Sequence, residues 1–228
     1  MDKETNVIAL SLHNNPLLDL NIKHKLYCII KDVFDILFSF IGMIVMLIFA
    51  IILKVSYVIT GDFHPIFFTQ KRIGKNGKEF KMYKFRTMIP DAEIKLKELL
   101  KEEPYKSQWK QNQKLDNDPR ITKIGKLLRK TSLDELPQFI NIYIGDMSII
   151  GPRPLVKGEL DDHNGNHAIY ESVRPGITGW WACNGRSATT YDERLELEYY
   201  YINNRNLILD LKCIYYTIKA ILFGKGAK

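Results

Sequence analysis

The longest apolar stretch of the chain runs from residue 36 to residue 53 and contains no charged residue. Eighteen helical residues extend about 27 Å, close to the bilayer hydrocarbon thickness of about 30 Å. The pattern therefore predicts a membrane-inserted helical segment over residues 21–60, preceded by a flexible polar tail over residues 1–20. A secretory signal is not expected, because the apolar stretch lies far from the amino end and no small-residue cleavage pattern follows it.

Basic residues flank this segment on both sides. Lys23, Lys25 and Lys31 precede it, and several lysines and arginines follow it between residues 71 and 81. Because cytoplasmic flanks of membrane helices are enriched in Lys and Arg, the charges favour a re-entrant hairpin over a straight span. A hairpin usually needs a helix breaker, however, and the segment offers only Gly42 and no proline. Both topologies stay open from the sequence.

Residues 61–228 show the mixed pattern of a helix-rich α/β domain. Short apolar runs at 66–70 and 80–85 flank the turn sequence Gly-Lys-Asn-Gly at 74–77, which predicts a β-hairpin. Residues 91–118 are strongly charged and predict a solvated helical insert broken at Pro104. Residues 191–223 have apolar residues at helical spacing, which fits either a core helix or an amphipathic helix at the membrane interface.

Charge and cysteine content narrow the class of partner. The chain has 33 Lys plus Arg and 26 Asp plus Glu, a net charge of +7, which favours an anionic partner. Aromatic residues alternate with Lys81, Lys84 and Arg86, a pattern that nucleic-acid surfaces share, but beside a membrane segment lipid headgroups are favoured and no nucleic acid is expected. Three cysteines without a CxxC pair argue against disulfides or a thiolate metal site and favour a cytoplasmic catalytic face.

The candidate chemistry lies between residues 127 and 155, where Asp134 and Glu135 are adjacent and arginines stand on both sides. Paired carboxylates with nearby guanidinium groups suit a metal ion and phosphate oxygens. Ser132 to Glu135 is also a capping-box pattern, which needs no catalytic role. Pro137 instead favours a helix that starts beside it, which leaves both carboxylates in the entry turn.

Two further arginines are candidates for contact with phosphate. Arg153 stands between Pro152 and Pro154, which restrict the backbone on both sides of it and preorganise its guanidinium. Arg186 follows Asn184 and Gly185 in a turn-like sequence.

Several motifs in order resemble the bacterial sugar transferases called monotopic phosphoglycosyl transferases. They are FFTQKRIGKNGKEFKMYKFRTM, DPRITKIGKLLRKTSLDELPQFINIYIGDMSIIGPRPL, VRPGITGWWACNGR and LDLK, and the resemblance covers residues 31–222. It implies transfer of a hexose-1-phosphate from a UDP-sugar to polyprenyl (undecaprenyl) phosphate with release of UMP. This would start capsule, exopolysaccharide or O-antigen assembly at the bacterial inner membrane, with the active site on the cytoplasmic face.

The resemblance also implies residue roles. Asp134 would be the nucleophile that forms a covalent phosphosugar intermediate, and Asp134 and Glu135 would hold Mg²⁺. The basic residues expected at substrate phosphate are Lys84, Arg86, Arg129, Arg153 and Arg186. Two alternatives remain: direct transfer with the acids serving only as metal ligands, and a non-catalytic membrane-anchored scaffold that binds anionic lipid or a glycan-assembly partner.

This sequence departs from the family pattern in three respects. The family's membrane helix usually breaks at a Ser-Pro pair, and the corresponding position here is Leu47-Ile48. The segment after Gly179 reads Trp-Trp-Ala-Cys-Asn, where relatives more often have Trp-Gln-Val or Ala-Gln-Val, so sugar or uridine contacts are expected to differ. The chain is expected to be a catalytic unit without the several-span amino-terminal domain of larger members. The sequence leans towards galactose or glucose as the sugar and is compatible with a homo-oligomer.

Overall fold

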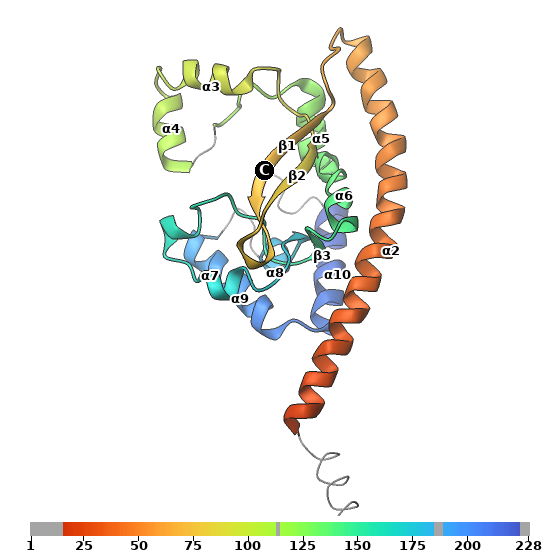
Figure 1. Cartoon of the computed structure of the whole chain (residues 1–228). Helices are drawn as coiled ribbons and strands as arrows, with labels where there is room; N and C mark the ends of the chain where they lie inside the picture. Colours follow the sequence, from red (N-terminus) through yellow and green to blue (C-terminus); the bar gives the residue numbers. More distant parts are fainter. Residues whose placement is uncertain (1–15, 113–114, 185–188, 224–228) are drawn as a thin grey trace, which may run out of the picture.

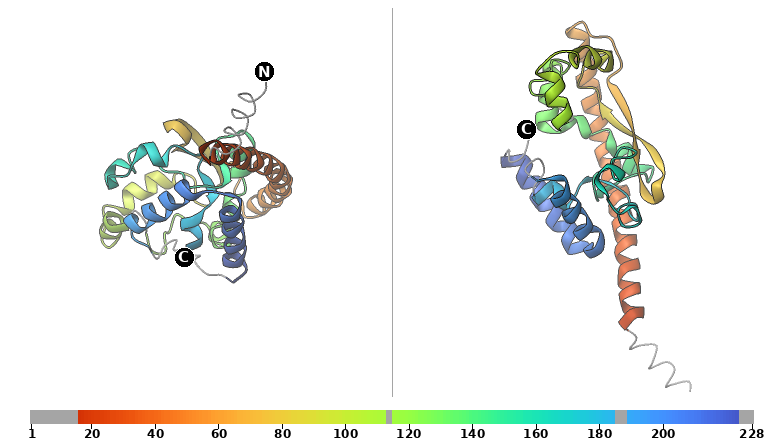
Figure 2. Two further views of the ribbon diagram at one scale, coloured as in Figure 1. Left: turned by 90° about the horizontal axis from the view of Figure 1, so that it is seen from below. Right: turned by 90° about the vertical axis from the view of Figure 1, so that its left-hand side faces the viewer.

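A single long helix runs along one side of a helix-rich body in the computed structural model, which describes residues 16–112, 115–184 and 189–223 (Figure 1). This helix, α2 (Pro16–Ile59), extends past the body at its amino-terminal end, as the side view in Figure 2 also shows. The body contains two small two-stranded sheets among its helices. The prediction of a helix-rich α/β fold is confirmed.

One stripe of α2 faces the body, and the other faces are exposed. From Asp35 to Tyr57 the buried positions recur every three or four residues, the spacing of a single helical face, and Tyr27 lies two turns earlier. A Cβ on Gly42 would overlap the ring of Phe139, so glycine allows α2 and the body to come into close contact there. The buried stripe comprises Tyr27, Asp35, Ser39, Gly42, Met46, Ala50, Leu53 and Tyr57.

Helix α2 continues through Leu47 and Ile48 without interruption. The re-entrant hairpin, favoured above, is therefore wrong for this structure, because no proline removes a backbone donor and Gly42 serves packing. The helix begins at Pro16, a residue suited to the first helical position and five residues before the segment predicted over 21–60. Most of the tail predicted over residues 1–20 lies outside the described residues. From Ile22 to Ile59, α2 is long and apolar enough to cross a membrane.

The predicted hairpin is confirmed. Strands β1 (Phe67–Ile73) and β2 (Glu79–Phe85) pair antiparallel, with Phe67 opposite Phe85 and Ile73 opposite Glu79. The connecting turn, η1 (Lys75–Gly77), uses a positive φ at Asn76 (58°) and Gly77 (73°), as this turn chemistry requires. The charged insert forms α3 (Ala92–Leu99) and α4 (Tyr105–Asn112), separated at Pro104 as predicted.

The remaining elements build the body around the second sheet. In order they are α5 (Lys123–Thr131), η2 (Leu133–Glu135), α6 (Gln138–Tyr143), β3 (Ser148–Ile150), η3 (Asp161–His163), α7 (His167–Tyr170), β4 (Gly176–Thr178), α8 (Trp180–Asn184), α9 (Tyr191–Asn204) and α10 (Leu207–Phe223). Strands β3 and β4 are parallel. The helix predicted over 191–223 is two helices, because Arg205 has an extended backbone and the Asn206 side chain caps α10 by accepting from Leu209 N at 3.0 Å.

Among the described residues, the buried apolar side chains form three clusters. One contains Leu160, Tyr170, Tyr201 and Cys213 from the loop after β3, α7, α9 and α10, and another joins the α2 stripe to β2 and α5. Helix α10 leaves much of its apolar surface exposed, including Ile208, Leu211, Tyr215 and Ile218.

Candidate active site

Asp134 and Glu135 lie in the short turn η2, between α5 and α6. Ser132 ends α5 with a left-handed φ of 57°, and its side chain makes no capping hydrogen bond to η2. The capping-box interpretation is therefore wrong. Helix α6 begins at Gln138, directly after Pro137, so both carboxylates lie in the entry turn as predicted.

Strand β2 brings a lysine to this turn. Lys84 Nζ donates to Glu135 Oε1 at 2.8 Å, and both side chains are partly exposed. The Asn141 side chain fixes β2 against α6, since its Oδ1 accepts from Tyr83 N at 2.9 Å and its Nδ2 donates to Lys81 O at 2.7 Å. The hydrogen bonds of Asn141 thus hold β2 and α6 together next to the Lys84 and Glu135 pair.

The Asp134 carboxyl is more than half removed from solvent. Burial raises the pKa of its carboxyl above the ordinary value, and the neighbouring Glu135 raises it further. The cations Lys84 and Arg129 act in the opposite direction. A partly desolvated carboxylate between two cations has the electrostatic setting of a nucleophile or metal ligand.

Close contact between α5 and the end of β2 positions Arg129. Its Nε donates to the hydroxyl of Thr87 at 3.0 Å. Helix α5 approaches so closely that a Cβ on Gly125 would overlap the backbone oxygen of Thr87. The oxygen also accepts from Thr122 N at 3.0 Å, at the start of α5. Glycine at position 125 therefore sets the distance between the strand and the helix that carries Arg129.

A buried ion pair to which the sequence analysis assigned no role lies behind Arg129. Arg120 donates to both carboxylate oxygens of Asp118, at 2.9 Å from Nε and 2.6 Å from Nη2. Burial alone would raise the pKa of Asp118, but the hydrogen bonds from Arg120 and the charge of Arg129 hold it below the ordinary value. Asp118 is thus an ionised partner for Arg129. The acid and arginine on either side of Pro119 were the only sequence signal.

Arg153 lies exposed in the turn between Pro152 and Pro154, with its Cζ atom 5.9 Å from the centroid of the Trp181 ring. Arg72, on β1, was also missed. Its Nη1 donates to Pro154 O at 3.2 Å. Burial and the nearby Arg153 lower the pKa of Arg72 to about 10, against the opposing charges of acids that include Glu135. Arg72 therefore connects the Arg153 turn to the carboxylate turn electrostatically.

Arg86, one of the predicted phosphate ligands, does not join this group. Arg86 donates to Asp62 Oδ2 at 2.7 Å, Pro65 O at 2.8 Å and Met88 O at 3.0 Å, and it stacks on Tyr57. Its donors hold the end of α2 to the hairpin, so the structure does not support a phosphate-binding role for Arg86. Arg186 lies outside the described residues.

The two carboxylates fit a magnesium ion by chemistry, since Mg²⁺ prefers oxygen ligands and usually retains several waters. Within residues 16–112, 115–184 and 189–223, no three His, Cys, Asp or Glu side chains gather as a metal site. An ion on Asp134 and Glu135 would thus complete its coordination with water and substrate phosphate, as at other phosphoryl-transfer sites.

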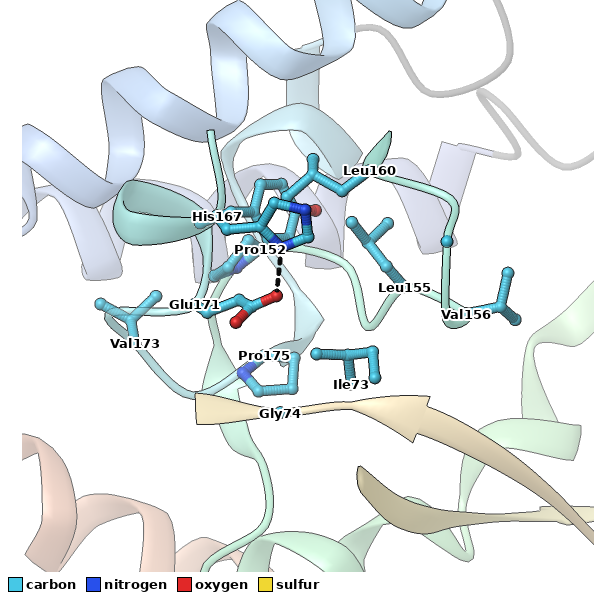
Figure 3. A pocket seen from close by; sticks show the side chains of 12 residues that line it. Ile73, Gly74, Pro152, Leu155, Val156, Leu160, His167, Glu171, Val173 and Pro175 are labelled. Carbon is cyan, nitrogen blue, oxygen red and sulfur yellow. Dashed lines mark hydrogen bonds and ion pairs between the residues drawn. The ribbon is translucent and has the colours of Figure 1, made fainter. Parts of the chain in front are cut away.

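A small enclosed cavity near the Arg153 turn is separate from these residues. It measures about 30 Å³, room for a few water molecules at most, which is far too small for a sugar nucleotide. Figure 3 shows Ile73, Leu155 and Pro152 around it, together with the hydrogen-bonded pair His167 and Glu171. The cavity has no predicted site residue in its lining.

The buried side chain of Glu198, on α9 (Tyr191–Asn204), should make the free energy of unfolding depend on pH. Burial raises its pKa to about 7, so the folded protein binds a proton more tightly than the unfolded chain between about pH 4.5 and pH 7. Stability from this group is present below pH 4.5 and is lost as the pH rises to 7. We expect Glu198→Gln to lack this loss, which amounts to about 3 kcal/mol at most. Thermal unfolding from pH 5 to pH 8 checks this, and parallel curves for both proteins would contradict it.

Comparison with known proteins identifies the family. Residues 26–224 match the family described as bacterial sugar transferase. The chain is 40% identical over 199 residues to the undecaprenyl-phosphate galactose phosphotransferase of Salmonella typhimurium, covering 87% of this chain and 41% of that protein. It is 43% identical over 203 residues to the galactosyl transferase CpsE of Streptococcus agalactiae, covering 89% of this chain and 44% of that protein.

A third relative has a similar length. The exopolysaccharide production protein ExoY of Sinorhizobium fredii is 39% identical over 198 residues, covering 86% of this chain and 87% of that protein. The chain spans less than half the length of the other two relatives. With a family match over most of its length, this chain belongs to the bacterial sugar transferase family.

Proposed function

We propose that this protein transfers a hexose-1-phosphate from a UDP-sugar to polyprenyl phosphate and releases UMP. Asp134 carries the proposal, because it is a partly desolvated carboxylate beside Glu135 with Lys84 and Arg129 close by. The acceptor is supported by the names of the Salmonella protein and of an Aeromonas hydrophila relative, a UDP-N-acetylgalactosamine-undecaprenyl-phosphate N-acetylgalactosaminephosphotransferase.

The proposed reaction consists of two phosphoryl transfers. A carboxylate oxygen of Asp134 attacks the sugar-bearing phosphorus, the bond from that phosphorus to the bridging oxygen breaks, and UMP leaves with the electron pair. A phosphate oxygen of the polyprenyl phosphate then attacks the same phosphorus. The bond to Asp134 breaks, which frees the carboxylate and yields the lipid diphosphate sugar.

The other residues bind and neutralise charge. Arg129 and Arg153 would hold the phosphate oxygens, whose charge is spread over the equatorial positions in the transition state. Lys84 orients Glu135 through their 2.8 Å hydrogen bond. Mg²⁺, held by Asp134 and Glu135 when bound, would supply charge neutralisation for the diphosphate.

The proposal places the protein at the bacterial inner membrane, with the site on the cytoplasmic face. Helix α2 exposes large apolar side chains on the faces turned away from the body, and α10 adds Ile208, Leu211 and Tyr215. Soluble proteins rarely expose apolar surface of this extent, whereas a bilayer covers it. Such a location gives access to an acceptor whose hydrocarbon chain lies in the membrane.

UMP release from a panel of UDP-sugars tests the function. With polyprenyl phosphate and Mg²⁺, we expect release from one donor, loss of that release on chelation, and recovery when Mg²⁺ is returned in excess, because paired carboxylates alone cannot neutralise a diphosphate. Folded, membrane-inserted protein that releases no UMP from any donor would overturn the proposal and favour the scaffold alternative.

A further inference from the structure

The backbone around Arg153 is held by several elements. Pro152 O accepts from Gly176 N at 2.8 Å, and Leu155 O accepts from Ile73 N at 2.8 Å. Arg153 O accepts from the hydroxyl of Tyr170 at 3.0 Å. Figure 3 shows Pro152, Leu155, Ile73 and Pro175 grouped around the small cavity beside this turn. The bond to Pro152 O acts on the amino side of Arg153, and the bonds to Arg153 O and Leu155 O act on its carboxyl side.

The amide N–H of Arg153 is bound by one side chain. Proline rings fix φ at residues 152 and 154, and Pro154 restricts ψ of Arg153, but φ of Arg153 is not restricted by either ring. Arg153 N donates to Glu198 Oε1 at 3.0 Å. Pro152 O and Arg153 N belong to the same peptide plane, so this hydrogen bond holds that plane together with the bond from Gly176 N to Pro152 O. Glu198 is the side chain that contributes to constraining the torsion which the prolines leave free.

Ordinary core packing does not account for Glu198. Its side chain is fully buried, at 1% exposure, and its second oxygen, Oε2, has no hydrogen-bond partner. A buried carboxylate with an unpaired oxygen is unfavourable compared with an apolar residue of similar size. The hydrogen bond that Glu198 accepts from Arg153 N is a specific reason for an acid at this buried position.

A second residue of α9, Arg194, shares an aromatic partner with the Arg153 side chain. Arg194, one turn before Glu198, is buried, and its Nη1 donates to Glu159 Oε1 at 3.3 Å. The Arg194 guanidinium lies 4.9 Å from the centroid of the Trp181 ring, and the Arg153 guanidinium lies over that ring too. Helix α9 thus contacts the Arg153 backbone directly through Glu198, and its Arg194 shares the Trp181 ring of α8 with the Arg153 guanidinium.

We propose that Glu198 is a positioning residue that holds Arg153 where it binds the phosphate of the substrate. This inference rests on the proposed function, because Arg153 is a phosphate ligand only in that reaction. Glu198 itself is enclosed in the core and acts through the Arg153 backbone.

Two substitutions separate the hydrogen bond from the packing. Glu198→Gln keeps an acceptor oxygen, whereas Glu198→Met has similar size without an oxygen acceptor. We expect Glu198→Met to raise KM for the UDP-sugar about tenfold with kcat within about threefold, and Glu198→Gln to stay within about threefold in both. In an Arg153→Ala background, Glu198→Met should add little, because its effect passes through Arg153.

Ile202→Ala serves as the matched control, since Ile202 is buried on the same helix one turn later. It should lower the melting temperature but leave KM unchanged. The inference is overturned if Glu198→Met behaves like this control, or if its effect on KM adds fully to that of Arg153→Ala.

A readout without substrate separates this inference from the proposed function. Hydrogen exchange of the peptide covering residues 150–156 should rise in Glu198→Met and stay near wild type in Glu198→Gln and Ile202→Ala. If the wild-type protein released no UMP, the proposed function would be refuted. The difference in hydrogen exchange would still show whether Glu198 holds the backbone around Arg153. Equal exchange in all variants would refute the positioning role even in an active enzyme.

Discussion

Replacing Asp134 with asparagine is expected to lower UMP release by about a thousandfold or more, because asparagine matches aspartate in size but cannot act as the attacking carboxylate. The variant is also expected to lose isotope exchange between labelled UMP and UDP-sugar in the absence of lipid acceptor. Wild-type protein should show that exchange, since the first transfer is reversible and needs no acceptor. Radiolabelled UMP and chromatography of the UDP-sugar measure it directly.

The exchange assay also distinguishes the two enzymatic mechanisms. Direct transfer, with the acids only as metal ligands, allows no exchange without polyprenyl phosphate even in the wild type. Asp162→Asn is the matched control, because it makes the same chemical change at an exposed position in η3. Activity that survives in Asp134→Asn at the level of this control would rule out Asp134 as the nucleophile.

Replacing Gly125 with valine is expected to be the most damaging change outside the carboxylate pair. The added side chain meets the backbone oxygen of Thr87, which cannot move without displacing the end of β2. Overpacking of this kind costs about 3 kcal/mol, which lowers the melting temperature of a chain of this size by roughly 6–12 °C. Because α5 also carries Arg129, UMP release in the surviving folded protein should fall about tenfold or more.

Leu127→Val provides the control for the valine substitution. It places the same β-branched residue on the same helix at a position that is 60% exposed, so it tests helix propensity without the contact to Thr87. Differential scanning calorimetry and the UMP assay apply to both variants. An unchanged melting temperature in Gly125→Val would contradict the close contact between α5 and Thr87.

Local signals in the sequence predicted the local structure well. Turn residues at 74–77 predicted the hairpin because positive φ is favoured at Asn and Gly. Pro137 indicated the start of α6 and kept Asp134 and Glu135 outside the helix, since proline disrupts a helix interior. These features depend on a few neighbouring residues and so are written in the sequence itself.

Features that depend on distant partners were beyond the sequence analysis. Arg86 was expected at phosphate, yet Asp62 and backbone carbonyls use its donors, and nothing in the basic pattern distinguishes it from Lys84. Glu198 lies 45 positions from the amide it accepts from. The hairpin break in α2 was expected from flanking charge, but packing of one continuous stripe against the body instead favours an unbroken helix.

The unbroken stripe on α2 fixes the height of the reaction centre. Leu133 and Leu136, on either side of the two carboxylates, pack with Met46, Ala50 and Leu53 of the helix. Helix α2 and the carboxylate turn therefore share one hydrophobic cluster. In the proposed membrane-bound state, sinking α2 along its axis by one turn would carry Asp134 about 5.4 Å in the same direction. The depth at which α2 sits in the bilayer would thus determine the distance between Asp134 and the phosphate of a lipid acceptor at the bilayer surface.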